Sequence, residues 1–182
     1  GQNWRASGKL PKVPARSFIN DVEASLHDAN TVFAVADAHK FGDYSPYLFI
    51  STDRGQSWQS IAGDLPKGNI VWVIKQDHQD ENLLFIGTEF GLYFSYNKGI
   101  NWIQLKVGVP TIPFRDIELH QRDHDLVGAT FGRGFYVLDD YSALREISAA
   151  VQAKANTLFA VRDAWWYVPA TPMQAKGMPT LG

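Results

Sequence analysis

The chain has 182 residues, of which 45% are apolar, and this suits one domain with a single hydrophobic core. No run approaches the roughly 18 apolar residues that a membrane-spanning helix needs, and a net charge of −2 excludes a broad basic surface for nucleic acid or an anionic membrane. The absence of cysteine excludes disulfides, thiolate metal sites and a cysteine nucleophile, whereas 11 Phe, 7 Tyr, 6 Trp and 15 Gly predict many short strands joined by tight turns.

The first 13 residues form an N-terminal extension in this interpretation. They contain no apolar segment of the kind found in signal peptides, so we expect none here.

A repeat follows the extension. Residues 51–58 (Ser-Thr-Asp-Arg-Gly-Gln-Ser-Trp) return 44 positions later as residues 95–102 (Ser-Tyr-Asn-Lys-Gly-Ile-Asn-Trp). A third copy is weaker: residues 128–130 (Gly-Ala-Thr) resemble residues 86–88 (Ile-Gly-Thr). The chain therefore contains three units of about 44 residues laid end to end.

Short apolar runs bounded by turn-forming residues predict the strands of these units. In chain order they are 18–26, 32–35, 47–50 and 57–61; 70–74, 83–86, 92–94 and 101–105; and 114–119, 125–128 and 135–138. Four strands in 40–45 residues is the size of a β-propeller blade. We therefore predict an all-β fold, a partial β-propeller of about three four-stranded blades.

This prediction divides the chain into segments. They are 1–13 (extension), 14–65 (first blade), 66–108 (second blade), 109–147 (third, degenerate blade), 148–168 (end of a helix and a closing strand) and 169–182 (mobile tail). Ser142 is expected to cap the short helix. The strand expected within 156–168 either packs against the last blade or supplies a strand to a neighbouring blade or chain.

The repeated octapeptide is suited to a hairpin turn. Asp53 can accept hydrogen bonds from the backbone that follows it, and Gly55 suits a position with positive φ. Trp58 then covers the base of the turn with its ring. A catalytic role for Asp53 is the weaker alternative, because the second copy has asparagine at this position. The structural residues predicted on this basis are Ser51, Asp53, Gly55, Trp58, Ser95, Asn97, Gly99 and Trp102.

These octapeptides resemble Asp-boxes, also called bacterial neuraminidase repeats. The wider sequence is similar to bacterial sortilin/Vps10-like proteins that are often labelled glycosyl hydrolases, on the stretches 45–55, 87–93 and 129–140. The resemblance implies a propeller in which these turns lie away from any catalytic centre, and it implies a secreted or periplasmic location.

The family's propellers are larger than three blades, and propellers close with about four to eight. The resemblance therefore implies that this chain corresponds to the C-terminal part of a propeller. An open stack of three blades exposes apolar sheet faces, so we expect self-association, with a homodimer that completes a six-bladed ring as one form.

Two places are candidates for ligand contact. The first is an insertion of eight residues around 39–46 that only the first unit has, in which Asp37, His39 and Asp43 follow a strand. The second is formed by Glu89 and Arg133, which occupy matching connections in the second and third units. The alternatives are an ordinary solvated loop for the insertion, and an ion pair with Asp139 or Asp140 for Arg133.

The segment 120–125 (His-Gln-Arg-Asp-His-Asp) has the composition of a metal site, but similar polar residues recur at the same place in the other units. That recurrence favours a polar turn, and we predict no metal and no cofactor. The predicted function is a non-catalytic scaffold or binding module for protein, peptide or glycan. The alternative is a sialidase-like glycosidase whose active site is incomplete in this chain.

Overall fold

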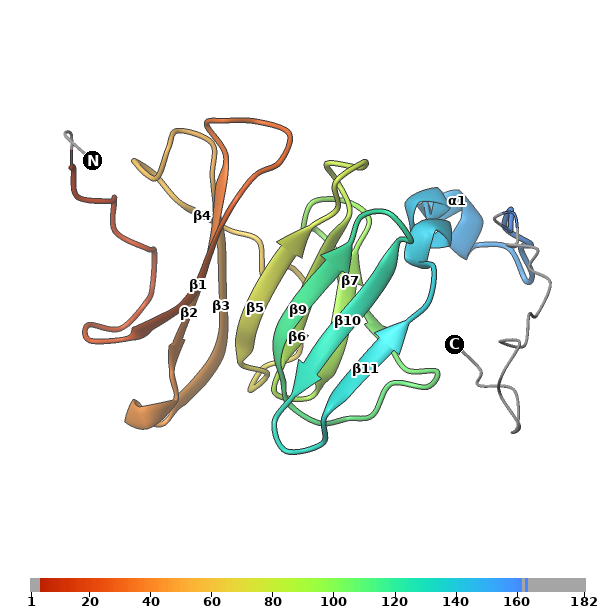
Figure 1. Ribbon diagram of the computed structural model, residues 1–182. Helices are drawn as coiled ribbons and strands as arrows, with labels where there is room; N and C mark the ends of the chain where they lie inside the picture. Colours follow the sequence, from red (N-terminus) through yellow and green to blue (C-terminus); the bar gives the residue numbers. More distant parts are fainter. Residues whose placement is uncertain (1–3, 162, 164–182) are drawn as a thin grey trace, which may run out of the picture.

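The computed structural model describes residues 4–161 and residue 163. In this part of the chain three antiparallel sheets lie side by side (Figure 1). The first contains β1 (Phe18–Ala24), β2 (Val32–Ala38), β3 (Asp43–Ser51) and β4 (Gln59–Ser60). The second contains β5 (Val71–Gln76), β6 (Leu84–Thr88), β7 (Gly91–Ser95) and β8 (Ile103–Leu105). The third contains β9 (Phe114–His120), β10 (Asp125–Thr130) and β11 (Phe135–Leu138).

Consecutive strands are neighbours in every sheet, so each sheet is a meander. The all-β prediction is confirmed, but the third sheet has three strands among the described residues where four were predicted for each blade. Its sequence lacks a third copy of the turn motif that precedes the fourth strand in the other two sheets. After β11, Asp140 takes a left-handed conformation (φ 50°), and the chain turns away into a 3-10 helix.

Two hydrophobic cores hold the sheets together, and the second sheet contributes to both. Leu84 and Ile86 of β6 pack with side chains of the first sheet, whereas Phe85 between them packs with side chains of the third. Since alternate residues of a strand point to opposite faces, both faces of the second sheet are buried. This is why the central strands are continuously apolar in sequence.

The C-terminal segment differs from the prediction. The 3-10 helix η2 (Tyr141–Glu146) is capped by Asp140, and the short helix α1 (Ala149–Gln152) is capped by Ser148, so Ser142 is not the N-cap of a single helix. The backbone is extended at Ile147 (φ −69°, ψ 131°), and this separates the two helices.

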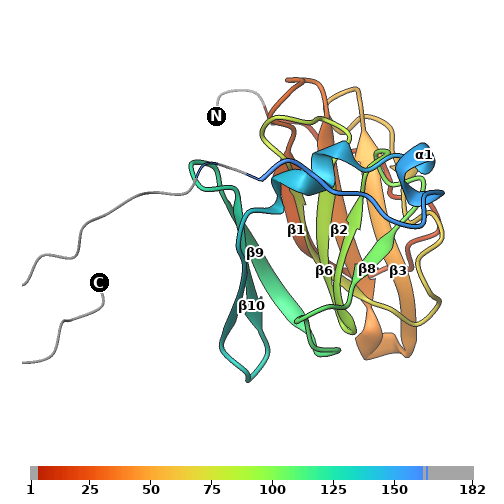
Figure 2. The ribbon, with the colours of Figure 1, turned by 90° about the vertical axis from the view of Figure 1, so that its right-hand side faces the viewer.

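Figure 2 views the molecule from the side of η2 and α1. Leu144 and Ile147 pack on the second core, which fixes this segment against the sheets. Residues 156–161 form no strand, and Leu158 is 95% exposed. Apart from residue 163, the rest of the predicted closing strand lies outside the described residues, as does the predicted tail (169–182). None of the described helices has the length and apolar character needed to cross a bilayer.

Candidate functional site

The candidate site lies along one edge of the three sheets. In each sheet the start of the first strand pairs with the end of the second, as Phe18 does with Asp37, Val71 with Thr88 and Phe114 with Thr130. The connections between second and third strands therefore lie at the same end. We call this end the connection edge; it comprises residues 37–44, 88–91 and 130–134 with the adjoining strand starts, and it runs along the lower side of Figure 1.

A β-bulge occurs at the same place in the first strand of every sheet. The pairing register shifts between Ile19 and Asp21, between Val71 and Val73, and opposite Ala129 and Thr130 in the third sheet. The extra residues are Asn20, Trp72 and Arg115. A bulge re-aims the side chain of the extra residue, and here it turns Trp72 and Arg115 toward the connection edge.

Trp72 is the centre of the site, and its side chain contacts groups from all three sheets. Its indole Nε1 donates a hydrogen bond to Glu89 Oε2 at 3.0 Å. The guanidinium of Arg115 lies 3.5 Å from the centroid of the indole ring, and the His39 ring stands edge-on to it at 5.7 Å. Because Trp72 is only 8% exposed, packing holds its ring in place, and the side chains that contact the ring are more exposed.

Glu89 and Arg115 form an ion pair at 3.8 Å beside the Trp72 ring. Their side chains are 32% and 40% exposed, so both reach solvent. The same guanidinium lies 5.4 Å from the ring of Phe131, which extends the cluster to the third sheet. The cluster is therefore an arginine held between two aromatic rings and a carboxylate.

Asp37 and His39 form the first sheet's part of the site. The backbone N–H of His39 donates to Asp37 Oδ1 at 3.0 Å, and the imidazole Nδ1 contacts the same oxygen. Burial raises the pKa of the Asp37 carboxyl, but the hydrogen bonds from His39, together with one from Asn20, outweigh it and hold the pKa below its ordinary value. Asp37 is therefore a buried, ionised carboxylate, 1% exposed, that orients His39.

Half of the predicted insertion (39–46) is strand. Only His39–Phe41 (η1) and Gly42 form the connection, and β3 already begins at Asp43. Asp43 accepts hydrogen bonds from the Tyr47 hydroxyl at 2.6 Å and from the Ser45 backbone N–H at 3.0 Å. These bonds, the first above all, lower the pKa of Asp43 and tie the carboxylate to its own hairpin. The other extra residues lie where the pairing register of this hairpin shifts, between the pairs Ala36–Tyr47 and Ala38–Asp43.

Arg133 lies on the connection edge with its side chain exposed. Its backbone N–H donates to Thr130 Oγ1 at 3.2 Å. Within the described part of the chain, the cation that pairs with Glu89 is Arg115 and not Arg133. Thus Asp37, His39 and Glu89 are brought together by Trp72, whereas Asp43 and Arg133 lie apart from that cluster.

Each of the three connections also carries one exposed aromatic ring. Phe41, Phe90 and Phe131 are 51%, 49% and 71% exposed. Three large apolar rings are therefore open to solvent on one edge, and an exposed ring of this kind can stack on a flat ligand.

The repeated turns occupy the opposite edge. Ser51 Oγ accepts a hydrogen bond from the Gly55 N–H at 2.8 Å, as Ser95 Oγ does from Gly99. Asp53 accepts from the Ser57 hydroxyl and from the N–H groups of Gln56 and Ser57. The bonds from Ser57 are the main reason that the pKa of Asp53 is held far below its ordinary value.

Asparagine is expected to replace Asp53 with little loss of stability, because Asn97 Oδ1 accepts the corresponding N–H bond from Asn101 at 2.9 Å in the second turn. Alanine should lower the midpoint of thermal unfolding, since it leaves the N–H groups of the turn without their acceptor. Thermal denaturation followed by circular dichroism compares the two variants. Equal midpoints for both would contradict a hydrogen-bonding role for this side chain.

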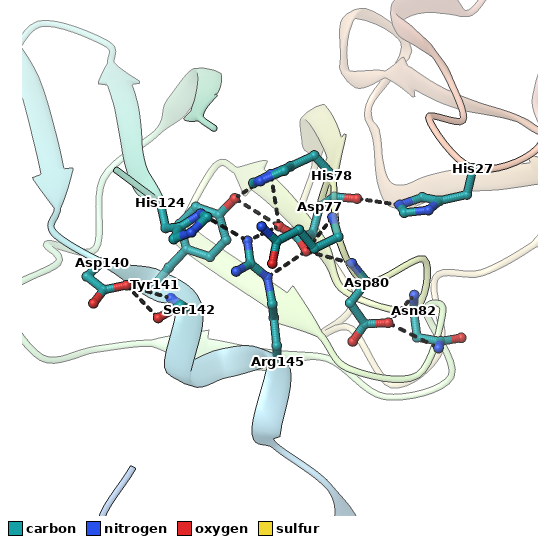
Figure 3. A network of polar contacts seen from close by, with 11 residues as sticks. His27, Asp77, His78, Asp80, Asn82, His124, Asp140, Tyr141, Ser142 and Arg145 are labelled. Carbon is teal, nitrogen blue, oxygen red and sulfur yellow. Dashed lines mark hydrogen bonds and ion pairs between the residues drawn. The ribbon is translucent and has the colours of Figure 1, made fainter. Parts of the chain in front are cut away.

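A buried polar network also lies at the opposite edge, between the sheets (Figure 3). Asp77 is fully buried, and its carboxylate accepts two hydrogen bonds from Arg145, both at 2.8 Å, and one from the Tyr141 hydroxyl at 2.9 Å. His27 Nε2 lies 2.7 Å from the Asp77 carbonyl oxygen, and the rings of His78 and His124 are stacked 5.4 Å apart. The network joins all three sheets to η2, and its residues were not among those predicted from the sequence.

The structure brings His120, Asp123 and Asp125 together, with ligand atoms within 4.8 Å of one another. Arg122 and His120 contact the Asp123 carboxylate at 2.7 and 3.1 Å, and Asp125 Oδ1 accepts a hydrogen bond from the Asp140 N–H. Contacts of this kind, between side chains close in sequence and with a backbone N–H, are typical of a polar turn.

Solved structures with a similar arrangement of sheets include GH74 enzymes. An ancestral GH74 enzyme is 23% identical with a TM-score of 0.52 over 63% of this chain, and the GH74 enzyme of Niastella koreensis is 18% identical with a TM-score of 0.54 over 67%. The GH74 xyloglucanase of Xanthomonas campestris is 16% identical with a TM-score of 0.50 over 67%. The fold is a partial β-propeller.

The blades in this chain match only 14%, 21% and 22% of the lengths of those three proteins. At such identities the likeness concerns the fold and not the chemistry. No protein-family model matches the chain, and no curated protein matches it.

Proposed function

We propose that the chain is a non-catalytic binding module whose connection edge takes a glycan. The observation that carries the proposal is that Phe41, Phe90 and Phe131 are exposed on the same edge as an arginine that is held on a buried tryptophan. Aromatic faces stack on the apolar faces of sugar rings, and Glu89 and Arg115 supply hydrogen-bonding groups for hydroxyls. The carboxylates of this edge already have partners within the chain, which favours an uncharged ligand over a charged peptide.

The positions of the carboxylates speak against glycoside hydrolysis at this edge. A glycosidase needs two carboxyl groups that face the substrate, one of them a protonated acid with a raised pKa. Asp37 is 1% exposed and its pKa is lowered, while Glu89 is occupied by the Trp72 indole and by Arg115.

Arg115→Ala is expected to weaken binding of a xyloglucan oligosaccharide roughly tenfold. The substitution removes a hydrogen-bond donor, and it also removes the guanidinium that holds the Trp72 and Phe131 rings in position. Isothermal titration calorimetry measures the change, and the titrated sample is assayed for new reducing ends. The control is Arg122→Ala, since the Arg122 side chain is 82% exposed at the opposite edge and should leave affinity unchanged.

Equal loss of affinity in both variants would overturn the assignment to the connection edge. Release of reducing ends would overturn the non-catalytic proposal in favour of a glycosidase. If the protein binds a peptide and no oligosaccharide, the ligand class is peptide and not glycan.

We also propose that the turns at 51–58 and 95–102 are Asp-boxes of the sortilin/Vps10-like kind, supported by their matching Ser Oγ bonds. Positive φ at Gly55 (79°) and Gly99 (87°) supports the same assignment. Self-association belongs to this proposal, because the outer faces of the first and third blades expose apolar side chains such as Val22 and Phe135.

A further inference from the structure

Residues 7–12 repeat the end of the first blade. Ser-Gly-Lys-Leu-Pro-Lys at 7–12 matches Ala-Gly-Asp-Leu-Pro-Lys at 62–67, with Gly, Leu, Pro and Lys identical at a constant spacing of 55. In the first blade this sequence follows the fourth strand and leads into the next blade. The N-terminal segment therefore has the sequence of a blade end.

The contacts of the two segments repeat as well. Trp102 Nε1 of the second blade's turn donates to the Ile61 carbonyl at 2.9 Å, and Trp58 Nε1 of the first blade's turn donates to Ser7 Oγ at 2.9 Å. Gly63 lies so close to the carbonyls of Gly99 and Ile100 that a Cβ would collide with them. Gly8 lies in the same way against the carbonyl of Gln56, and its N–H donates to the Gly55 carbonyl at 2.7 Å. Segment 4–11 thus takes the place of a preceding blade's end.

A cavity of about 450 Å³ lies beneath this segment, on the outer face of the first blade. The aliphatic side chains that line it come from β1 and β2: Ile19, Val22, Val32 and Ala34. The strand pairings place these residues at the positions that Val71, Ile74, Leu84 and Ile86 hold in the second blade. There the same positions are buried in the first core by the first blade. The cavity is therefore shaped for the strands of another blade.

The third blade has the complementary face. It has three strands in the described part of the chain, and its edge strand β11 exposes Phe135 (75%) and Val137 (57%). The pairing registers place Val137 at the position of Ile50, which packs in the first core together with Ile74. Since Val22 corresponds to Ile74, a third blade seated on the first would bring Val137 against Val22.

We infer that the outer face of the first blade receives the third blade of a second copy, and that segment 4–11 completes that blade as its outer end. Two copies related by a two-fold axis then form a six-bladed ring, within the four to eight blades with which propellers close. This inference rests on the self-association proposed above and names its surface. The two connection edges become the mouth of one ring.

Val22→Asp tests this surface, because a carboxylate at a side chain that is 60% exposed in one chain would be buried in the ring. Sedimentation velocity at about 10 µM should give wild type at twice 20.4 kDa and Val22→Asp at 20.4 kDa. Ile100→Asp is the control, since Ile100 is 70% exposed on a turn outside the interface and this variant should remain dimeric.

The chain has no cysteine, so paired cysteines can trap the contact. Oxidation of the Val22→Cys, Val137→Cys double variant should give a covalent dimer, and the Val22→Cys, Ile100→Cys double variant should not. A monomeric wild type would overturn the inference. A Val22→Asp dimer would also overturn it while leaving self-association in place, and neither result bears on glycan binding, which the Arg115 titration measures separately.

Discussion

Asp77→Asn is expected to lower the free energy of unfolding by about 3–5 kcal/mol, because it leaves Arg145 without its anionic partner in the interior. Asp77 is fully buried, and the Arg145 side chain is 14% exposed. The two charges come from a turn of the second blade and from η2, 68 residues apart in sequence, so the pair fastens the C-terminal segment to the sheets. Urea denaturation followed by tryptophan fluorescence measures the loss.

Asp80→Asn is the matched control, since it makes the same change in the same turn. Asp80 Oδ1 accepts a hydrogen bond from the Asn82 N–H, which an asparagine oxygen can also accept. Its effect should therefore be close to zero. Adding Arg145→Met to Asp77→Asn should recover part of the lost stability by removing the unpaired cation. Additive losses in the double variant would contradict the ion-pair explanation.

The same network predicts the direction of the pH dependence. Burial raises the pKa of Asp77, but hydrogen bonds from Arg145, Tyr141 and the backbone outweigh it and lower the pKa from an ordinary 3.8 to about 2. The stabilisation is complete above about pH 4 and is lost as the pH falls through 2. Burial also lowers the pKa of His78, so protonation near and below its ordinary 6.5 favours the unfolded chain. Stability should fall with acidification, and Asp77→Asn should abolish the step between pH 4 and 2.

Phe114→Ala is expected to cost about 3–5 kcal/mol, because the ring is fully buried between the second and third blades and nothing nearby fills its space. Two glycines make room for this residue. A Cβ on Gly87 would lie 2.7 Å from the Phe114 carbonyl oxygen, and a Cβ on Gly128 would lie 2.7 Å from the ring. The ring and the two glycines therefore pack as one unit. Chemical denaturation measures the loss of stability in Phe114→Ala.

Gly128→Ala serves as the control in a double-mutant cycle with Phe114→Ala. In wild type it should destabilise by about 1–3 kcal/mol, since the added methyl presses on the Phe114 ring. In the Phe114→Ala background the methyl enters the vacated space, so the second substitution should cost much less. Independent effects of the two substitutions would show that the glycine serves some purpose other than making room for the ring.

Much of the fold was predictable because its signals are local. The turn at 51–58 is built from hydrogen bonds within eight residues, so its sequence alone determines the conformation, and its second copy established the period. Alternation and short apolar runs placed all eleven described strands. The C-terminal prediction was wrong at Ser142, because the buried ring of Tyr141 and the extended backbone at Ile147 decide where those helices begin and end.

The candidate site was predictable only in part. Asp37 and His39 were named because they follow a strand in an insertion that only the first unit has, and Glu89 because it occupies a connection that recurs in the third unit. The structure gathers all three around Trp72. Trp72 and Arg115 were not recognised as site residues. Each is the extra residue of a bulge, and a bulge is defined by the pairing partner, which the strand's own sequence does not contain. Asp77 lies in one of the polar turns between first and second strands, and the sequence of that turn does not reveal its partner, which lies 68 residues away.

By itself the sequence determined three repeated units, their strands and their hydrogen-bonded turns, because periodicity and short-range bonding are properties of neighbouring residues. The tertiary structure decided which side chains of different blades meet at the connection edge and which charges are buried together. It also showed that residues 4–11 sit where a blade end belongs. Those features depend on packing between sheets, and packing is settled only when segments far apart in the chain lie against one another.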